Sequence, residues 1–435
     1  MKFKYLPSGW KTFYQIWSGQ VVSLVGTAMS RFALMIWAYQ QTGSATTLAL
    51  LGFFNFWAIV LCSSFTGSVV DRFKRKHVML LADSCAALVS VCILLLYLSG
   101  GLEIWHLYLL QALSGMFEAF QYPAYQASIT LLVPRDDFTR AASLNGLAES
   151  SSRVLAPVLA GLLLPVAGIQ SILLIDLATF LVAFMTLVAA KIPQPAGPAS
   201  KEEKTISAKA GWDFIRLRPG LVGLIFVFAA INLFAGLTYY SIIAPMILAR
   251  SGNSTLTMSW VEAALGLGGI AGGVLLSIWG GPRQRVKGML IVTGLSFLLG
   301  DGLFAFGRSL PVWVLAGFIS NMSVPFISAP NQAIWQAKTP PELQGRVFAL
   351  RGMLQMVTIP IGYLAAGPLA DHIFEPAMMV GGNLSQTFGW VSGVGPGAGM
   401  GLMFAITALC GLLTGIISYA VPAVRHVEQD LPDTV

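Results

Sequence analysis

The groups most able to do chemistry in this chain are ionisable side chains inside long apolar stretches. Glu118 lies near the middle of one such stretch, and Arg31 lies in the outer half of the first. Glu149 and Arg153 are four residues apart, so they share one face of a helix. A carboxyl group in a low dielectric can bind and release a proton, which is the chemistry that ion-coupled transport needs. These four residues are therefore the candidates for proton or substrate coupling.

Each embedded ionisable group also has a structural interpretation. Glu118 is alternatively part of a buried ion pair or a neutral acid held by hydrogen bonds, and the spacing of Glu149 and Arg153 favours a structural pair. Asn145 extends that helix face by one turn, and Asp83 is expected to support the loop after the second apolar stretch. The other embedded groups are expected to pack helices together or to lie near the membrane interfaces: Asp176, Glu262, Asp301 and Arg351.

These side chains must be positioned by helices that cross a membrane. The chain is 56% hydrophobic and only 10% charged, which is too apolar for a soluble protein of 435 residues. The apolar runs are continuous rather than alternating, so they predict helices and not a barrel. Twelve runs have about the 20 residues that a spanning helix needs. They are Phe13–Tyr39, Leu48–Val70, Val78–Leu98, Trp105–Leu132, Ala141–Val166, Ile169–Ala190, Leu221–Ala249, Trp260–Trp279, Met289–Phe306, Pro311–Gln336, Val347–Ala370 and Met400–Pro422.

The positive charges fall on alternate connections between these runs. Of 26 Lys and Arg residues, 21 lie on one side, three lie within spans, and only Arg250 and Arg308 lie on the other side. The positive-inside rule then predicts a multi-pass protein of the cell membrane, plasma or inner, with both termini in the cytoplasm. An odd number of spans would destroy the asymmetry, so it supports twelve. The net charge of +7 is accordingly a topology signal, and no nucleic-acid partner is expected.

The chain divides into two similar halves. We expect a six-helix bundle over residues 1–190, a cytoplasmic linker over 191–219 and a second six-helix bundle over 220–435. The segment PAYQASITLLVPRDDFTRA from Pro123 is similar to PNQAIWQAKTPPELQGRV from Pro330, and each ends one apolar run and precedes the next. Paired six-helix halves are typical of secondary transporters, with the substrate site between them.

Two connections are longer than the rest. The linker is charged and contains several prolines, and it is expected to include a short amphipathic helix around Gly211–Arg218. The external, glycine-rich connection over residues 371–399 is either a partly ordered lid or, as we favour, a tolerated loop insertion.

The loop after the second span reads GSVVDRFKRK, with Gly67, Asp71, Arg72 and Arg75. This resembles the signature G-x-x-x-D-R-x-G-R-R/K of the major facilitator superfamily, with Lys74 in place of the second glycine. The resemblance implies that the four residues form a cytoplasmic latch, which closes the cytoplasmic ends of the two halves in one state and opens in another. The alternative is ordinary positive charge flanking a span.

Span five reads RVLAPVLAG, in which Ala156, Pro157 and Gly161 resemble the helix-bend motif G-P-x-x-G-G of exporters in the same superfamily. Small residues allow close packing and the proline bends the helix. The segments FYQIWSGQVVSLVG, LVPRDDFTRAASLNG, GGIAGGVLL and ELQGRVFALRG are similar to the macrolide-efflux and siderophore-exporter group. That group exports lipophilic or amphipathic compounds in exchange for protons.

The superfamily layout implies that spans one, four, seven and ten line a central cavity. Glu118 and Arg31 then line it, while Glu149 and Arg153 border it. The substrate cavity is expected to include polar and aromatic side chains of these spans: Gln121, Tyr122, Tyr125, Gln126, Asn232, Tyr239, Asn321 and Gln332. Such a lining suits amphipathic or aromatic solutes better than a sugar or a small ion.

Together these features predict an all-α polytopic membrane protein with the major facilitator fold. Its expected function is proton-coupled efflux of lipophilic or amphipathic small molecules, macrolide-like or siderophore-like, by alternating access. The expected partners are the substrate, protons and the lipid bilayer, and the protein is expected to be a monomer. The sequence contains no nucleotide-binding or catalytic signature, so no enzyme, cofactor or metal is expected. The alternatives are a nutrient importer or uniporter of the same fold and a non-transporting membrane protein.

Overall fold

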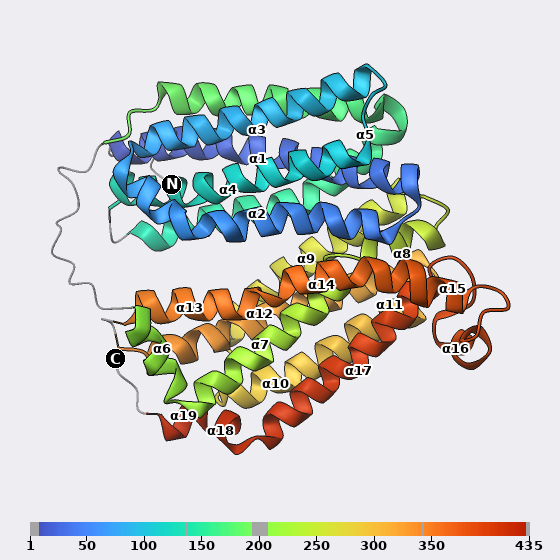
Figure 1. Cartoon of the computed structure of the whole chain (residues 1–435). Helices are drawn as coiled ribbons and strands as arrows, with labels where there is room; N and C mark the ends of the chain where they lie inside the picture. The colour runs from blue at the N-terminus through green and yellow to red at the C-terminus, as the bar shows by residue number, and fades with distance from the viewer. Residues whose placement is uncertain (1–7, 135–136, 194–207, 341–342, 432–435) are drawn as a thin grey trace. The chain divides into compact units, whose positions relative to one another are not determined.

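The computed structural model describes residues 8–134, 137–193, 208–340 and 343–431, except the side chains at positions 8, 64, 67, 68, 71, 139 and 208–210. All the regular secondary structure in these described ranges is helical, as the continuous apolar runs predict. The chain packs as two units, each a bundle in Figure 1. Unit 1 is Met1–Thr42 with Leu50–Glu203, and unit 2 is Gly43–Ala49 with Lys204–Val435.

The helices α1 to α5 build unit 1, apart from the first residues of α2. Their bounds are α1 Ser8–Thr42, α2 Ala45–Arg72, α3 Arg75–Leu98, α4 Ile104–Leu132 and α5 Phe138–Ala189. Within α5, Gly168 has a φ of 70°, a left-handed conformation that interrupts a right-handed helix. Two helices therefore meet at Gly168, near the boundary predicted between the fifth and sixth spans.

Two glycines bring α1 against the second helix of α5. A Cβ atom added at Gly19 would lie 2.1 Å from the Thr186 hydroxyl, and one at Gly26 would lie 2.1 Å from the Thr179 hydroxyl. The seven-residue spacing puts both glycines on one face of α1, so no side chain holds the helices apart. The other faces of α1 remain free to line an interior space.

The helices from α6 onward build unit 2. Their bounds are α6 Ala208–Arg216, α7 Pro219–Leu237, α8 Ile243–Arg250, α9 Thr255–Trp279, α10 Arg285–Ser296, η2 Phe297–Asp301, α11 Gly302–Phe306, α12 Leu310–Lys338, α13 Gln344–Met356, α14 Thr358–Pro368, η3 Leu369–Phe374, α15 Glu375–Met378, α16 Ser385–Ser392, α17 Ala398–Ala420, α18 Pro422–Arg425 and α19 Val427–Asp430. The short helix α6 matches the amphipathic helix expected in the linker. Its Phe214 and Ile215 are buried in the core of unit 2, so α6 packs against this bundle.

The connection over residues 371–399, which is predicted to be external, is folded, with η3, α15 and α16 in it. The Arg250 guanidinium donates to the carbonyl oxygens of Gly307 at 2.6 Å, Ser392 at 2.8 Å and Gly397 at 3.1 Å. Glu375 accepts hydrogen bonds from the backbone N–H groups of Gly397 and Met400 at the start of α17. These bonds tie the connection to unit 2, so it is ordered rather than partly ordered, and the favoured interpretation of a tolerated loop insertion stays a prediction.

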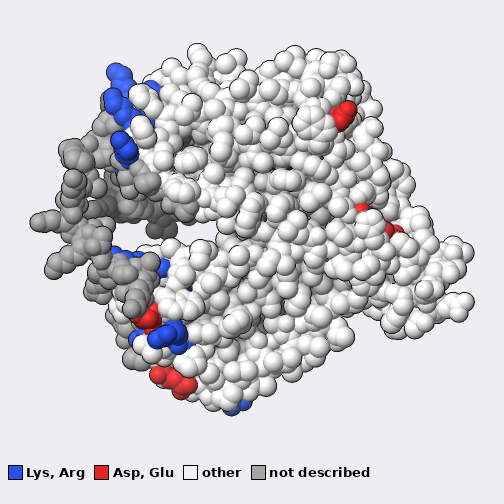
Figure 2. All heavy atoms as spheres, viewed as in Figure 1, with Lys and Arg blue, Asp and Glu red and all other residues white. Residues whose placement is uncertain are grey.

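The lengths and compositions of the helices fit a membrane protein. Among the described residues, ten helices are long and apolar enough to cross a membrane, and α5 is counted as one of them. Counting α5 as two spans at Gly168 and adding the 29-residue α4 would give the predicted twelve, which stays a prediction. Within each unit, the Lys and Arg side chains visible in Figure 2 gather mainly at one end of the bundle, and the rest of the visible surface is largely uncharged.

Candidate functional site

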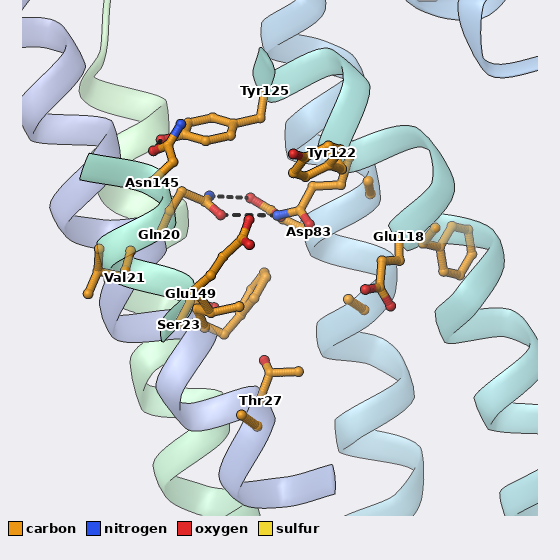
Figure 3. Close-up of a pocket in the computed structure, with 18 of the residues that line it drawn as sticks. Gln20, Val21, Ser23, Thr27, Asp83, Glu118, Tyr122, Tyr125, Asn145 and Glu149 are labelled. Atoms are coloured by element: carbon orange, nitrogen blue, oxygen red, sulfur yellow. Dashed lines mark hydrogen bonds between the residues drawn. The ribbon is translucent and has the colours of Figure 1, made fainter. Parts of the chain in front are cut away.

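Unit 1 contains a partly open cavity of about 220 Å³ between α1, α3, α4 and α5 (Figure 3). On α1 it is lined by Trp17, Gln20, Leu24, Thr27 and Arg31, among others. The steps of three and four residues between them put these side chains on one helix face. The glycine face of α1 packs on α5, and this second face therefore opens on the cavity.

The two leading coupling candidates form an ion pair in the cavity wall. The Arg31 guanidinium donates to a Glu118 carboxylate oxygen at 2.6 Å, across 87 positions of the sequence. The side chains are 44% and 38% exposed, so neither is deeply buried. An ion pair that keeps contact with an open cavity can exchange a proton or a substrate without unfolding the helices. The ion pair foreseen as an alternative for Glu118 is thus formed, but it is not a buried one.

A second carboxyl group in the wall is held by amides. Asp83 on α3 accepts hydrogen bonds from Gln121 at 2.7 Å and from Gln20 at 3.3 Å, and Gln121 also donates to the Gln20 carbonyl oxygen at 3.1 Å (Figure 3). Asp83 is only 5% exposed, and these two amides satisfy both of its oxygens. The expected role for Asp83, support of the loop after α2, is wrong, because its side chain points into the bundle and bonds to α1 and α4.

A third carboxyl group, Glu149, lines the cavity from α5 together with Asn145. The Asn145 carbonyl oxygen accepts a hydrogen bond from the Tyr125 hydroxyl at 2.9 Å. Arg153 shares the helix face of Glu149, but it is exposed and lies outside the cavity lining. The two side chains form no ion pair, so the structural pair suggested by their spacing is absent. An (i, i+4) spacing allows such a pair but does not require it.

The remaining residues that were predicted to line the substrate cavity have different surroundings in the two bundles. Gln121, Tyr122, Tyr125 and Gln126 all line the cavity in unit 1. Those of unit 2 make hydrogen bonds within their own bundle: Asn232 to the Gln355 carbonyl, Tyr239 to Asp301 and Ser320, Asn321 to the Leu265 carbonyl, and Gln332 with Arg351. Tyr239 also packs edge-on against Phe304 and Phe404, so its side chain is part of the packed interior of unit 2.

Several buried polar groups pack helices within a unit. Asp176 accepts hydrogen bonds from Thr27 and Ser90, each at 3.0 Å, and so joins α5 to α1 and α3. Asp301 accepts from Tyr239 at 2.8 Å and Thr407 at 2.7 Å, and so joins η2 to α17 and the end of α7. Both aspartates are buried and therefore do not extend to a membrane interface.

The latch prediction is only partly within the described residues, because the side chains of Gly67 and Asp71 lie outside them. Arg72 is exposed. Arg75 donates to the Ala127 carbonyl oxygen at 2.5 Å, and the neighbouring Lys76 donates to the carbonyl oxygens of Val188 and Ala190. Val188 and Ala190 lie at the C-terminal end of α5, where carbonyl groups have no partner within the helix, so the Lys76 cation satisfies them. These two basic residues thus join the start of α3 to neighbouring helices of unit 1.

The bend motif lies inside the first helix of α5. Ala156 and Gly161 are buried and Pro157 is inside the helix, as the small-residue pattern indicates. Sequence reasoning gave no role in the cavity to Trp17 and Gln20. Trp17 and Gln20 precede Arg31 by 14 and 11 residues, which are close to four and three turns of an α-helix. This spacing could have placed all three residues on one face of the helix.

A mainly apolar cavity inside a bundle of membrane-length helices, with an ion pair and an amide-held acid in its wall, is compatible with a membrane transporter. The family model of the Major Facilitator Superfamily matches residues 16–363, and the chain belongs to this family. This confirms the predicted family and the helical membrane fold, and it makes the protein a transporter.

Comparisons with individual proteins agree with this family assignment. Macrolide efflux protein A of Streptococcus pyogenes is 28% identical over 374 residues, which cover 84% of this chain and 91% of that protein. The enterobactin exporter EntS of Shigella flexneri is 24% identical over 346 residues, which cover 78% and 80%. A bacterial homologue of the lysosomal transporter Spinster, solved in an inward-facing conformation, shares the fold with a TM-score of 0.71 and 16% identity over 99% of this chain and the whole of that one.

Proposed function

We propose that this protein exports lipophilic or amphipathic small molecules, macrolide-like or siderophore-like, in exchange for protons. The observation that carries the proposal is the Arg31–Glu118 ion pair, which lies half exposed in the wall of an aromatic and polar cavity. The named efflux activities of two relatives, macrolide and enterobactin export, support export over uptake. The protein would act as a monomer in the plasma or inner membrane, with both termini in the cytoplasm.

In the proposed cycle, alternating access exposes the cavity first to one side of the membrane and then to the other. Glu118 takes up a proton on the outer side, which weakens its ion pair with Arg31, and releases it inside, where the pair forms again. Arg31 favours the ionised carboxylate, and Glu149 and Arg153 modulate it from α5. Asp71 and Arg72, with Gly67 and Arg75, would close the cytoplasmic side in the outward-open state.

The energy available is sufficient for useful export. One proton entering down a potential of 100 mV contributes about 2.3 kcal/mol. For an uncharged substrate exchanged one for one, that supports an outward concentration ratio of roughly 50-fold before any pH gradient is added.

The proposal is tested by Glu118→Gln in everted membrane vesicles, with labelled macrolides, siderophores and dyes as candidate substrates. The amide keeps the shape of the side chain but cannot carry a proton. We expect pH-gradient-driven accumulation to be lost, while exchange of labelled for unlabelled substrate without a gradient continues. Asp430→Asn, which removes an exposed charge far along the chain, is the matched control and should leave both activities intact.

Unchanged gradient-driven transport in Glu118→Gln would remove Glu118 from the coupling mechanism. The rival importer is separated in intact cells by collapsing the gradient with an uncoupler. Cells with an exporter then retain more substrate, whereas cells with an importer retain less. Binding of substrate without any vectorial movement in proteoliposomes would instead favour a non-transporting membrane protein.

A further inference from the structure

Part of the connection over residues 371–399 is apolar, uncharged and exposed. Residues 376–399 contain no Asp, Glu, Lys, Arg or His. Four apolar side chains of this stretch are exposed, Met379, Val380, Trp390 and Val394, with Val380 at 88% and Trp390 at 72%, and together they form the apolar surface of the connection. Figure 2 shows no charged side chain over α16. Clustered exposed apolar side chains mark contact with another protein or with lipid.

The apolar surface belongs to a folded segment. The Gly395 N–H donates to the Met378 carbonyl oxygen at 3.0 Å, which joins the stretch before α16 to the stretch after it. A Cβ atom added at Gly389 would lie 3.0 Å from a methyl group of Val394, so this side chain packs against α16. Met378 turns inward and is fully buried. The apolar surface is therefore a fixed feature of unit 2.

This surface lies beside a face of unit 2 that must meet lipid. The segment Arg285–Phe306 is long and apolar enough to cross a membrane. Along it, Ile291, Leu295, Leu298 and Phe306 are exposed apolar residues that recur every one or two turns. Within a bilayer, apolar side chains that point away from their own bundle face the lipid. Phe306 is the last residue of the segment, so it marks the level at which the chain leaves the hydrocarbon.

Trp390 lies at that boundary. The ring centroids of Trp390 and Phe306 are 6.2 Å apart, with 43° between the ring planes. Arg308, two residues beyond Phe306, is exposed and donates from Nη2 to the Gly389 carbonyl oxygen at 3.3 Å. An indole ring and a guanidinium group therefore lie near each other at the end of the span. Both have an apolar body and a polar tip, which suits the layer between hydrocarbon and water.

We propose that the apolar surface of the connection is an interfacial membrane anchor, which lies on the lipid leaflet next to Phe306. Trp390 is inserted among the headgroups and Arg308 reaches their phosphate groups. The occupant is the bilayer that the protein itself spans, because the surface continues the lipid-facing side of that span. Since the connection is bonded to the start of α17, the anchor also fixes the level of α17 in the bilayer. The proposal goes beyond export and does not depend on it.

The test measures the surroundings of single fluorescent labels on the full-length protein in lipid nanodiscs. In a cysteine-free background, the dye NBD is attached at Val380→Cys or Val394→Cys, both of which retain Trp390. Leu295→Cys in the middle of the span is the hydrocarbon reference, and Asp430→Cys, an exposed charged position, is the water reference. The quenchers are iodide in the water and lipids that carry a doxyl group either near the headgroup or deep in the acyl chain.

We expect iodide to quench the labels at positions 380 and 394 about fivefold less than the label at position 430, as burial among headgroups implies. The doxyl group near the headgroup should quench these two labels more strongly than the deep doxyl group. The label at position 295 should show the reverse order. Both test positions are exposed, so their replacement leaves the packed interior intact.

A second pair of variants tests the role of Trp390 itself. Trp390→Ser and Gln386→Ser are made in the protein labelled at position 394. Gln386 is an exposed polar residue of the same helix and is the matched control. Trp390→Ser should raise iodide quenching at position 394 by about twofold or more, because the inserted ring is lost. Gln386→Ser should leave it unchanged.

Iodide quenching at positions 380 and 394 that equals quenching at position 430 would place the surface in water and overturn the proposal. Protection from both iodide and the doxyl lipids would show that protein covers the surface, such as a second copy of this chain, and would also overturn it. Equal effects of Trp390→Ser and Gln386→Ser would reject Trp390 as the anchoring residue. None of these measurements uses a substrate or a gradient, so their failure leaves the proposed export untouched.

Discussion

Alanine at Gly268 or Gly272 should force α9 away from α12 and destabilise unit 2. A Cβ atom at Gly268 would lie 2.2 Å from the carbonyl oxygen of Phe318, and one at Gly272 would lie 2.1 Å from that of Met322. Both obstacles are backbone atoms of a helix, which cannot rotate away as a side chain can. The four-residue spacing on each helix makes the two contacts successive turns of one interface.

The magnitude follows from this geometry. Ordinary contact with a Cβ atom begins near 3.4 Å, so each alanine requires the helices to separate by more than 1 Å or to bend. Such overpacking costs about 1–3 kcal/mol per site. Alanine returns about 0.5–1 kcal/mol because it favours the helix over the unfolded chain more than glycine does. We therefore expect a net loss of about 0–2.5 kcal/mol for each single variant, and more for the double variant.

The neighbouring glycines provide matched controls in the same helix. A Cβ atom at Gly269 or Gly273 would meet no heavy atom within 4 Å, so alanine there should be neutral or slightly stabilising. The assay heats the four single variants in the same detergent. Unfolding is measured as the loss of the monodisperse peak on size-exclusion chromatography, which gives a midpoint temperature for each variant. Midpoints for Gly268→Ala and Gly272→Ala that match those of Gly269→Ala and Gly273→Ala would refute the close packing of α9 on α12.

Two further predictions concern the external connection and the orientation. Arg250→Ala removes the hydrogen bonds that hold the connection, so limited proteolysis near Trp390 should accelerate about tenfold or more, whereas Arg308→Ala, which loses one exposed contact of 3.3 Å, should differ little from wild type. Equal proteolysis of the two variants would contradict the anchoring role. In a cysteine-free background, an impermeant maleimide applied to intact cells should label Arg308→Cys and not Lys74→Cys. The reverse pattern would invert the predicted topology.

The separate members of the candidate site could be predicted from the sequence, but their pairing could not. Glu118 and Arg31 stand out because ionisable groups are rare in apolar spans. That they meet at 2.6 Å depends on how α1 and α4 are packed, and no short-range pattern contains this information. Asp83 illustrates the same point. Its position near the end of a span suggested a role beside the loop, yet two glutamines from other helices place it in the cavity wall.

The sequence by itself determined the class of structure, because hydrophobicity and helical periodicity are properties of consecutive residues. Continuous apolar runs of membrane length require helices, since a backbone in lipid must satisfy its own hydrogen bonds. The tertiary structure alone decided which polar residues share a space. Gln121 and Tyr125 line the cavity while Tyr239 and Asn321 bond within their bundle, although all four lie in helices of similar composition. The reason is physical: the side of a helix that faces a neighbour is set by close packing at residues such as Gly19 and Gly26, which act across large distances in the chain.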